Sequence, residues 1–84
     1  MNLLFIVFRN RTSTMMFFDI LKRNRIYGRI VSTPKKITSS CGLSVETNIS
    51  NLNIILKIIK QGNFNSLVGI YKSNVNDSFF DKIY

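Results

Sequence analysis

The spacing of apolar residues along the chain predicts four strands. Residues 3–8 form a continuous apolar run of strand length, which is typical of a central strand buried on both faces. Residues 43–47 alternate between apolar and polar side chains, which indicates a half-buried strand. Shorter apolar segments at 27–31 and 67–71 are the remaining two predicted strands.

Two other stretches have the spacing of amphipathic helices. The first follows the strand at 3–8, and three hydroxyl residues are candidates for its N-terminal cap: Thr12, Ser13 and Thr14. Its predicted buried face consists of four apolar residues: Met16, Phe17, Ile20 and Leu21. Asn24 is its predicted end, because asparagine tolerates a left-handed backbone better than most residues.

The second helix is predicted between the strands at 43–47 and 67–71. Asn48 or Ser50 is its predicted cap, and Gly62 is its predicted end. Its core stripe has four members at helical spacing: Leu52, Ile55, Leu56 and Ile59. Beside this stripe lie Ile54 and Ile58, which either widen the core face or contact a second copy of the chain.

The predicted order of elements is βαββαβ. Because each βαβ unit needs a right-handed crossover, both helices are expected on one face of a four-stranded antiparallel sheet, the ferredoxin-like arrangement of the α+β class. The other face is then open or covered by a partner. We expect one domain over residues 1–72 and a polar C-terminal tail over residues 73–84, part of which docks through its apolar residues: Phe79, Phe80, Ile83 and Tyr84.

Composition narrows the class of protein. A chain of 84 residues forms one domain with a thin core. Its one cysteine rules out an internal disulfide and fits a reducing cytoplasm. The apolar run at 3–8 is too short to span a bilayer, and it lacks the basic residue and the cleavage site of a signal peptide. We therefore expect a cytoplasmic protein without a membrane partner.

The charge of the chain is strongly positive. Twelve Lys and Arg residues against four Asp and Glu residues give a formal net charge of +8. Such a charge attracts polyanions without specifying which, or it simply forms a solvated surface.

The residue inventory argues against a self-sufficient enzyme. Without histidine the chain has no Ser-His or Cys-His dyad and no imidazole metal ligand. One cysteine excludes CxxC redox and zinc-finger patterns. The four carboxylates are scattered, and no glycine-rich loop precedes a helix. We therefore expect no enzyme activity, no metal and no cofactor.

Cys41 is the remaining candidate for chemistry, at the end of an aperiodic loop over residues 32–40. Nearby positive charge lowers the pKa of a thiol, hydroxyl groups hydrogen-bond to a sulfur anion, and glycine allows close approach of another backbone. The loop residues that supply these features or its turn are Pro34, Lys35, Lys36, Ser39, Ser40 and Gly42. A thiolate in such a loop accepts sulfur or selenium as a persulfide or selenenyl sulfide. A free cysteine is, however, also a common buried and unreactive residue.

Residues 30–43 resemble the signature of a small bacterial family of unknown function described as "putative Se/S carrier protein-like". The shared pattern is a hydrophobic strand, the pair Pro34-Lys35, an isoleucine, a hydroxyl-rich run and Ser-Cys-Gly-Leu. The likeness extends in element order from Leu3 through Tyr71. A related domain forms the C-terminal part of YedF-type selenium-metabolism proteins.

The resemblance implies that Cys41 is the family's cysteine, which takes sulfur or selenium from a donor protein and passes it to an acceptor protein. Two departures from the family pattern concern packing. The pair Asn24-Arg25 stands where a glycine-containing turn is expected, and residues 16–18 are bulkier than the small residues expected there.

Two other functions are alternatives. The first is a nucleic-acid-binding module, which a four-stranded sheet with a free face and a charge of +8 suits, although the strand at 43–47 lacks the aromatic residues of RNA-binding sheets. The second is a small interaction or regulatory domain that dimerises through its sheet or through Ile54 and Ile58, with Cys41 buried and inert.

Overall fold

The structure is a computed structural model that describes residues 2–37, 41–62, 64–73 and 80–84. Its elements in chain order are β1 (Leu3–Phe8), α1 (Arg11–Arg23), β2 (Arg29–Ser32), β3 (Leu43–Asn48), the 3₁₀ helix η1 (Ile49–Asn51), α2 (Leu52–Gly62), β4 (Leu67–Ser73) and β5 (Phe80–Lys82). The predicted βαββαβ order is therefore present, and one further strand follows it.

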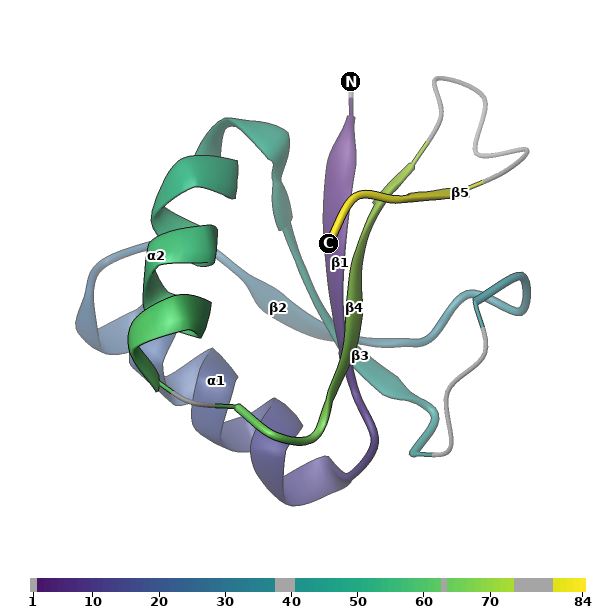
Figure 1. Ribbon diagram of the computed structural model, residues 1–84, viewed down its shortest axis with the longest axis horizontal. Coiled ribbons are helices and arrows are strands. Elements are labelled where there is room, and N and C mark those ends of the chain that lie inside the picture. The colour runs from purple at the N-terminus through teal and green to yellow at the C-terminus, as the bar shows by residue number, and fades with distance from the viewer. Residues whose placement is uncertain (1, 38–40, 63, 74–79) are drawn as a thin grey trace.

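The strands form a single antiparallel sheet in the order β2-β3-β1-β4-β5, with α1 and α2 on the same side of it (Figure 1). The fold class is α+β, as predicted, but the sheet has five strands rather than four. The fifth strand, β5, lies in the segment 73–84, for which the sequence predicts a polar tail. Its three residues are too few to have a recognisable period, and pairing with β4, where Ser73 lies opposite Phe80, holds them in place.

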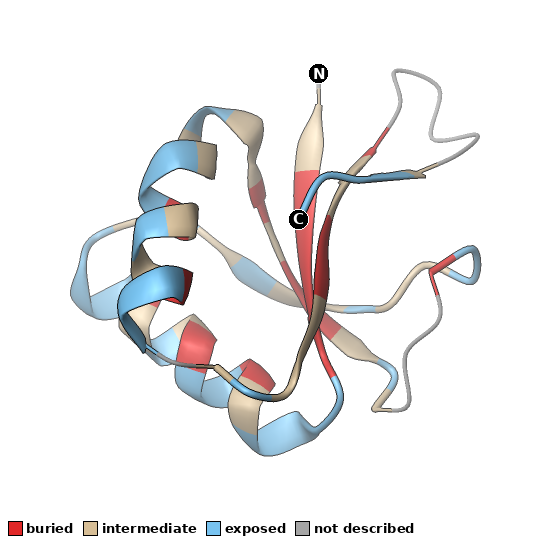
Figure 2. Cartoon of the chain, viewed as in Figure 1, coloured by how far each residue is buried: buried red, intermediate tan, exposed pale blue. Residues whose placement is uncertain are grey.

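β1 is the central strand and is buried on both faces, as its continuous apolar run predicts. Its even-numbered residues face the helices. They belong to a core cluster built from both helices and from strands β1, β3 and β4: Leu4, Ile6, Phe8, Phe17, Leu21, Val45, Ile55, Ile59 and Ile70. Figure 2 shows buried residues along β1 and on the sides of the helices that face the sheet.

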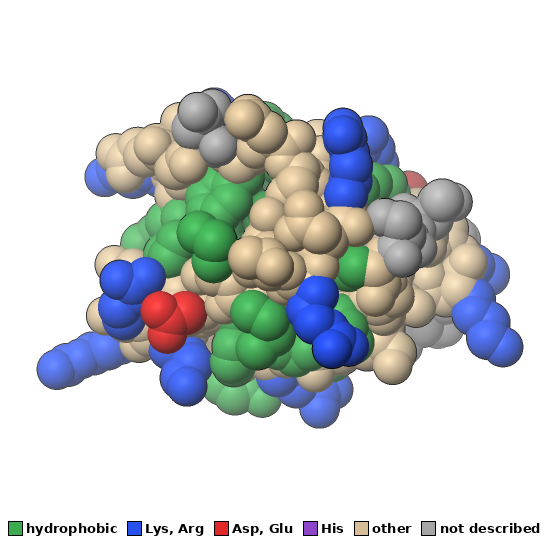
Figure 3. All heavy atoms as spheres, turned by 90° about the horizontal axis from the view of Figure 1, so that it is seen from below, with side chains coloured by type: hydrophobic (Ala, Val, Ile, Leu, Met, Phe, Trp, Pro, Cys, Tyr) green, Lys and Arg blue, Asp and Glu red, His purple; other side chains and the backbone are tan. Residues whose placement is uncertain are grey.

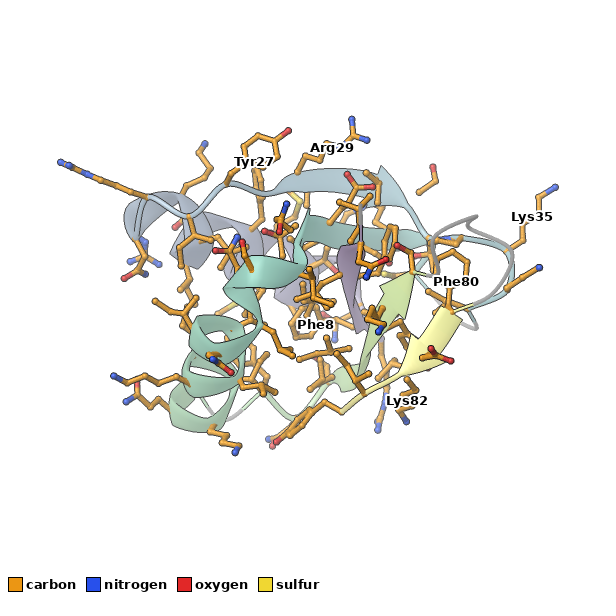
Figure 4. The ribbon with its side chains drawn as sticks, turned by 90° about the horizontal axis from the view of Figure 1, so that it is seen from above. Phe8, Tyr27, Arg29, Lys35, Phe80 and Lys82 are labelled. Atoms are coloured by element: carbon orange, nitrogen blue, oxygen red, sulfur yellow. The ribbon has the colours of Figure 1, made fainter. Side chains whose placement is uncertain are left out.

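Phe5 and Val7 of β1 face the opposite side of the sheet. There they pack with Ile37, which is 4% exposed, and the ring of Phe80 meets that of Phe5 edge-on at a centroid distance of 5.4 Å. Figure 4 shows Phe8 and Phe80 on opposite sides of the sheet. The prediction that this face is open or covered by a partner is therefore wrong where these side chains lie, since the chain covers them with its own Ile37 and Phe80.

The N-terminal end of α1 differs from the prediction. Asn10 is the cap, and its side-chain oxygen accepts a hydrogen bond from the backbone N–H of Ser13 at 2.8 Å. The three predicted caps, Thr12, Ser13 and Thr14, lie within the first turns of the helix. Six polar residues follow one another at 9–14, and their order alone does not say which of them has the extended backbone of a cap.

The buried face of α1 consists of Thr14, Phe17 and Leu21. Phe17 and Leu21 are predicted members of this face, but Met16 is 55% exposed and not part of it. Four consecutive apolar residues at 15–18 leave the helical face ambiguous in the sequence. The hydroxyl of Thr14 is tolerated in the core because it donates a hydrogen bond to the carbonyl oxygen of Asn10 at 3.0 Å.

The C-terminal end of α1 also differs. Asn24 has a φ of −94°, and the left-handed residue is Arg25, with a φ of 58°. The N–H of Arg25 donates to the carbonyl oxygen of Lys22 at 3.0 Å, and the N–H of Ile26 donates to that of Leu21 at 2.9 Å, which is a Schellman motif. Arginine therefore occupies a position that favours glycine, at the turn where the resemblance leads one to expect a glycine.

The second helix agrees with the prediction. Asn48 caps η1, which leads into α2, by accepting a hydrogen bond from the N–H of Ser50 at 2.8 Å. The predicted core stripe is confirmed, since all its members pack against the core cluster: Leu52, Ile55, Leu56 and Ile59. Ile58 also contacts this cluster, whereas Ile54 is 43% exposed, and the helix ends at Gly62.

Candidate functional site

Cys41 lies at the end of the sheet where β1 stops and β3 begins. These two strands are antiparallel neighbours, with Val7 opposite Ser44, so the last residue of β1 lies beside the first residue of β3. Helix α1 starts three residues after β1 and brings its first turns to the same end. The ends of two strands and the start of a helix therefore meet at Cys41.

The Sγ atom of Cys41 contacts a group from each of these three elements. It donates to the carbonyl oxygen of Leu43 at 3.2 Å and to that of Phe8 at 3.4 Å, and it lies 3.8 Å from Oγ1 of Thr14. A single S–H group serves one carbonyl at a time, so the two acceptors share it. These carbonyl contacts suit the protonated thiol, since a thiolate is an acceptor only.

Cys41 is half-buried, whereas Thr14 beside it is fully buried. Thr14 directs its own hydroxyl proton to the carbonyl oxygen of Asn10, so its oxygen is the atom left to meet the sulfur. The thiol is thus held at the rim of the core, in a niche with three oxygen atoms around its sulfur.

The loop that precedes Cys41 is anchored at both ends. The N–H of Thr33 donates to the carbonyl oxygen of Gly42 at 2.8 Å, and Oγ1 of Thr33 lies 2.6 Å from Oγ of Ser44. Within the loop, the N–H of Ile37 donates to the carbonyl oxygen of Pro34 at 2.9 Å, which closes a turn. The turn directs Ile37 onto the sheet face opposite the helices.

Gly42 turns the chain from Cys41 into β3. Its φ is 76°, in the left-handed region that favours glycine, and apart from its two chain neighbours no described residue comes within 4 Å of the position that a Cβ would take. The sequence suggests that Gly42 allows another backbone to approach. In the structure it is the backbone conformation, and not close approach, that requires glycine here.

The other predicted site residues lie in different surroundings. Pro34 is half-buried in the turn, and Lys35 and Lys36 are exposed. Figure 4 shows Lys35 pointing outward from the loop. The two predicted serines, Ser39 and Ser40, lie outside the described residues.

The chain matches the model of the family described as "Putative Se/S carrier protein-like" over residues 3–71. The match covers most of the chain and includes Cys41, its single cysteine. The chain belongs to this family. No curated protein and no solved structure gives a significant match. The match to the Se/S carrier-like family model begins at the first residue of β1 and ends within β4, so β5 lies beyond it.

The described residues contain no cluster of three or more His, Cys, Asp or Glu side chains placed to hold a metal ion. Across the same residues, no helix has the length and apolarity needed to cross a membrane.

Two ion pairs join described residues. Nε of Arg29 lies 2.6 Å from Oε1 of Glu46, its partner in the register of β2 and β3. The hydrogen bond and the charge of Glu46 raise the pKa of Arg29 above its ordinary value, so the guanidinium stays charged at every physiological pH. In α1, Nε of Arg23 lies 3.1 Å from Oδ2 of Asp19.

Sequence reasoning missed Thr14 and the carbonyl groups of Phe8 and Leu43 as the surroundings of the thiol. The predicted topology contains the signal for the carbonyl groups, because a βαββαβ sheet pairs the first strand with the third in antiparallel fashion. It also missed Ile37, a single apolar residue in a polar loop, for which the sequence carries no periodic signal.

Proposed function

We propose that Cys41 is a carrier thiol that holds a sulfur or selenium atom and passes it between partner proteins. The observation that carries this proposal is the family match over residues 3–71, within which the single cysteine of the chain is half-buried at an end of the sheet. The carrier acts without a cofactor and is not an enzyme in its own right. Its partners are a donor and an acceptor protein of the cytoplasm.

Loading is a transfer of sulfane sulfur. The thiolate of Cys41 attacks the outer sulfur of a persulfide on the donor, a bond forms between the two sulfur atoms, and the sulfur–sulfur bond of the donor breaks. The donor leaves as a thiolate that takes the proton lost by Cys41. No external oxidant is needed, and the same step with a selenium atom gives a selenenyl sulfide.

The niche supports this exchange through the atoms that hold Sγ. The carbonyl oxygens of Phe8 and Leu43 accept hydrogen bonds from the resting thiol and so orient Sγ. Gly42 carries no side chain that would stand between the sulfur and an approaching protein.

The test is intact-mass analysis after incubation with a cysteine desulfurase and cysteine. The wild-type protein is expected to gain the mass of one sulfur atom, which a reducing agent removes again. The Cys41→Ser variant is the matched control and is expected to stay at its original mass. Identical masses for the two proteins after incubation contradict the proposal.

One observation favours a second function, a small interaction domain with an inert cysteine. The contacts of Sγ with three elements also describe a structural thiol that ties the end of the sheet together. Failure of Cys41 to react in the native protein supports this reading. An RNA-binding surface on the sheet is less well supported, because Ile37 and Phe80 cover Phe5 and Val7 on the face that such a surface uses.

A further inference from the structure

Four residues of α1 form one stripe along the helix surface. They are spaced at i, i+4, i+7 and i+11, which places them on one face over about 16 Å: Arg11, Met15, Phe18 and Lys22. Met15 is 44% exposed and Phe18 is half-buried, while the cations at both ends are exposed. Nζ of Lys22 lies 5.4 Å from the centre of the Phe18 ring, so these two side chains point the same way.

This α1 stripe borders the thiol. Thr14, whose Oγ1 lies 3.8 Å from Sγ of Cys41, is three residues after Arg11 and four residues before Phe18. Residues at these spacings are neighbours on a helix surface. A protein that lies along the stripe therefore reaches the surface beside Cys41.

The stripe combines an apolar centre with positive ends. The one carboxylate of α1, Asp19, is paired with Arg23, so it does not neutralise Arg11 or Lys22. Figure 3, which views the molecule from the side on which α1 lies in Figure 1, shows hydrophobic side chains exposed among many Lys and Arg side chains and few carboxylates. The complement of such a surface is an apolar ridge with carboxylates at both ends.

We infer that the α1 stripe is the docking surface for a partner protein that presents an acidic amphipathic helix beside its own reactive sulfur. This inference describes the kind of partner protein that would exchange sulfur with the carrier, and it rests on the proposed carrier function. Attraction between the carboxylates and the positively charged carrier accelerates the encounter, and burial of Met15 holds the complex.

Two other occupants fit the stripe less well. In a second copy of this chain, the cations at the ends of one stripe would meet the cations at the ends of the other, and like charges repel. A single-stranded nucleic acid needs open aromatic faces for base stacking, but Lys22 already lies over the ring of Phe18. The surface therefore favours a protein with acidic and apolar side chains.

The test measures binding of a fluorescent synthetic peptide by anisotropy. The peptide is an amphipathic helix with leucines on one face and glutamates at both ends, and the control peptide has lysines in place of the glutamates. The protein used carries Cys41→Ser over residues 1–84, so that only docking is measured. Met15→Asp and Lys22→Glu alter the stripe, while Met16→Asp and Lys57→Glu make the same changes at exposed positions off the stripe.

We expect the acidic peptide to bind in preference to the lysine peptide. Met15→Asp and Lys22→Glu should each weaken binding about tenfold, whereas the two control variants should change it less than about twofold. Equal weakening by Met15→Asp and Met16→Asp overturns the inference, as does equal binding of both peptides. Tighter binding of a single-stranded oligonucleotide that is unaffected by Met15→Asp overturns it in favour of nucleic acid. Because the thiol is absent, this result is independent of whether Cys41 carries sulfur.

Discussion

The Sγ atom of Cys41 lies 3.4 Å from the carbonyl oxygen of Phe8, which precedes it by 33 residues. This contact joins the end of β1 to the residues that lead into β3. Sγ also contacts Thr14, which belongs to α1. A residue that is the candidate carrier thiol is therefore also part of the packing at this end of the sheet. The two roles lead to separate predictions.

Replacement of Cys41 is expected to have a modest effect on stability. Cys41→Ala removes a hydrogen-bond donor from the niche and should lower the free energy of unfolding by about 1 kcal/mol, while Cys41→Ser keeps a donor and should cost less. Urea denaturation of both variants measures the difference. If Cys41→Ala is as stable as the wild type, the contacts of Sγ with the carbonyl groups contribute nothing to the fold.

Replacement of Arg25 by glycine is expected to stabilise the protein. Arg25 has a φ of 58°, and a residue with a Cβ is strained there, so Arg25→Gly should raise the free energy of unfolding by roughly 0.5–1 kcal/mol. Asn24→Gly is the matched control. It should destabilise, because Asn24 has a negative φ and its Nδ2 donates to the carbonyl oxygen of Ile20 at 2.7 Å. Thermal unfolding of both variants gives the signs, and a destabilised Arg25→Gly protein would contradict the Schellman assignment.

Replacement of Ile37 by alanine tests whether the loop is anchored to the sheet. Ile37 is 4% exposed and packs on Phe5 and Val7, so the change should cost about 2 kcal/mol. It should also raise the alkylation rate of Cys41, since Ile37 and Cys41 share the loop closed by Thr33 and Gly42. Lys35→Ala, at an exposed position of the same loop, should leave the stability unchanged. An unchanged stability for Ile37→Ala would show that the loop does not hold to the sheet.

Removal of the Phe80 ring tests whether β5 belongs to the folded domain. Its edge-on contact with Phe5 and the pairing of β5 with β4 predict that Phe80→Ala lowers the free energy of unfolding by about 1–2 kcal/mol. Asp81→Ala, at an exposed position of the same strand, should have little effect. Equal stability of the two variants, measured in urea, would show that β5 contributes nothing to the core.

The sequence predicts the elements whose residues repeat with a clear period. The apolar run at 3–8 and the stripe that includes Ile55 and Ile59 are long enough to identify a central strand and a core helix. The face of α1 is less certain, since four apolar residues in a row fit several registers, and only the tertiary fold buries Thr14 and exposes Met16.

The candidate site is harder to predict than the fold. Cys41 is recognisable in the sequence because it is the single cysteine of the chain, and Gly42 is recognisable because it follows directly. The groups that hold the thiol are not, because two of them are backbone carbonyls, which every residue carries. Their proximity follows from strand pairing and from the start of α1, so they appear once the topology is known.

Reaction of Cys41 from the folded state is the central claim, and native-state alkylation with iodoacetamide measures it most directly. A carrier thiol reacts without global unfolding, so its rate should be the same in the wild type and in the stabilised Arg25→Gly variant. An inert packed thiol reacts only after unfolding, so its rate should fall with each gain in stability, about fivefold for 1 kcal/mol. Equal rates in the two proteins are the predicted result, and a rate that falls in step with stability would contradict the carrier function.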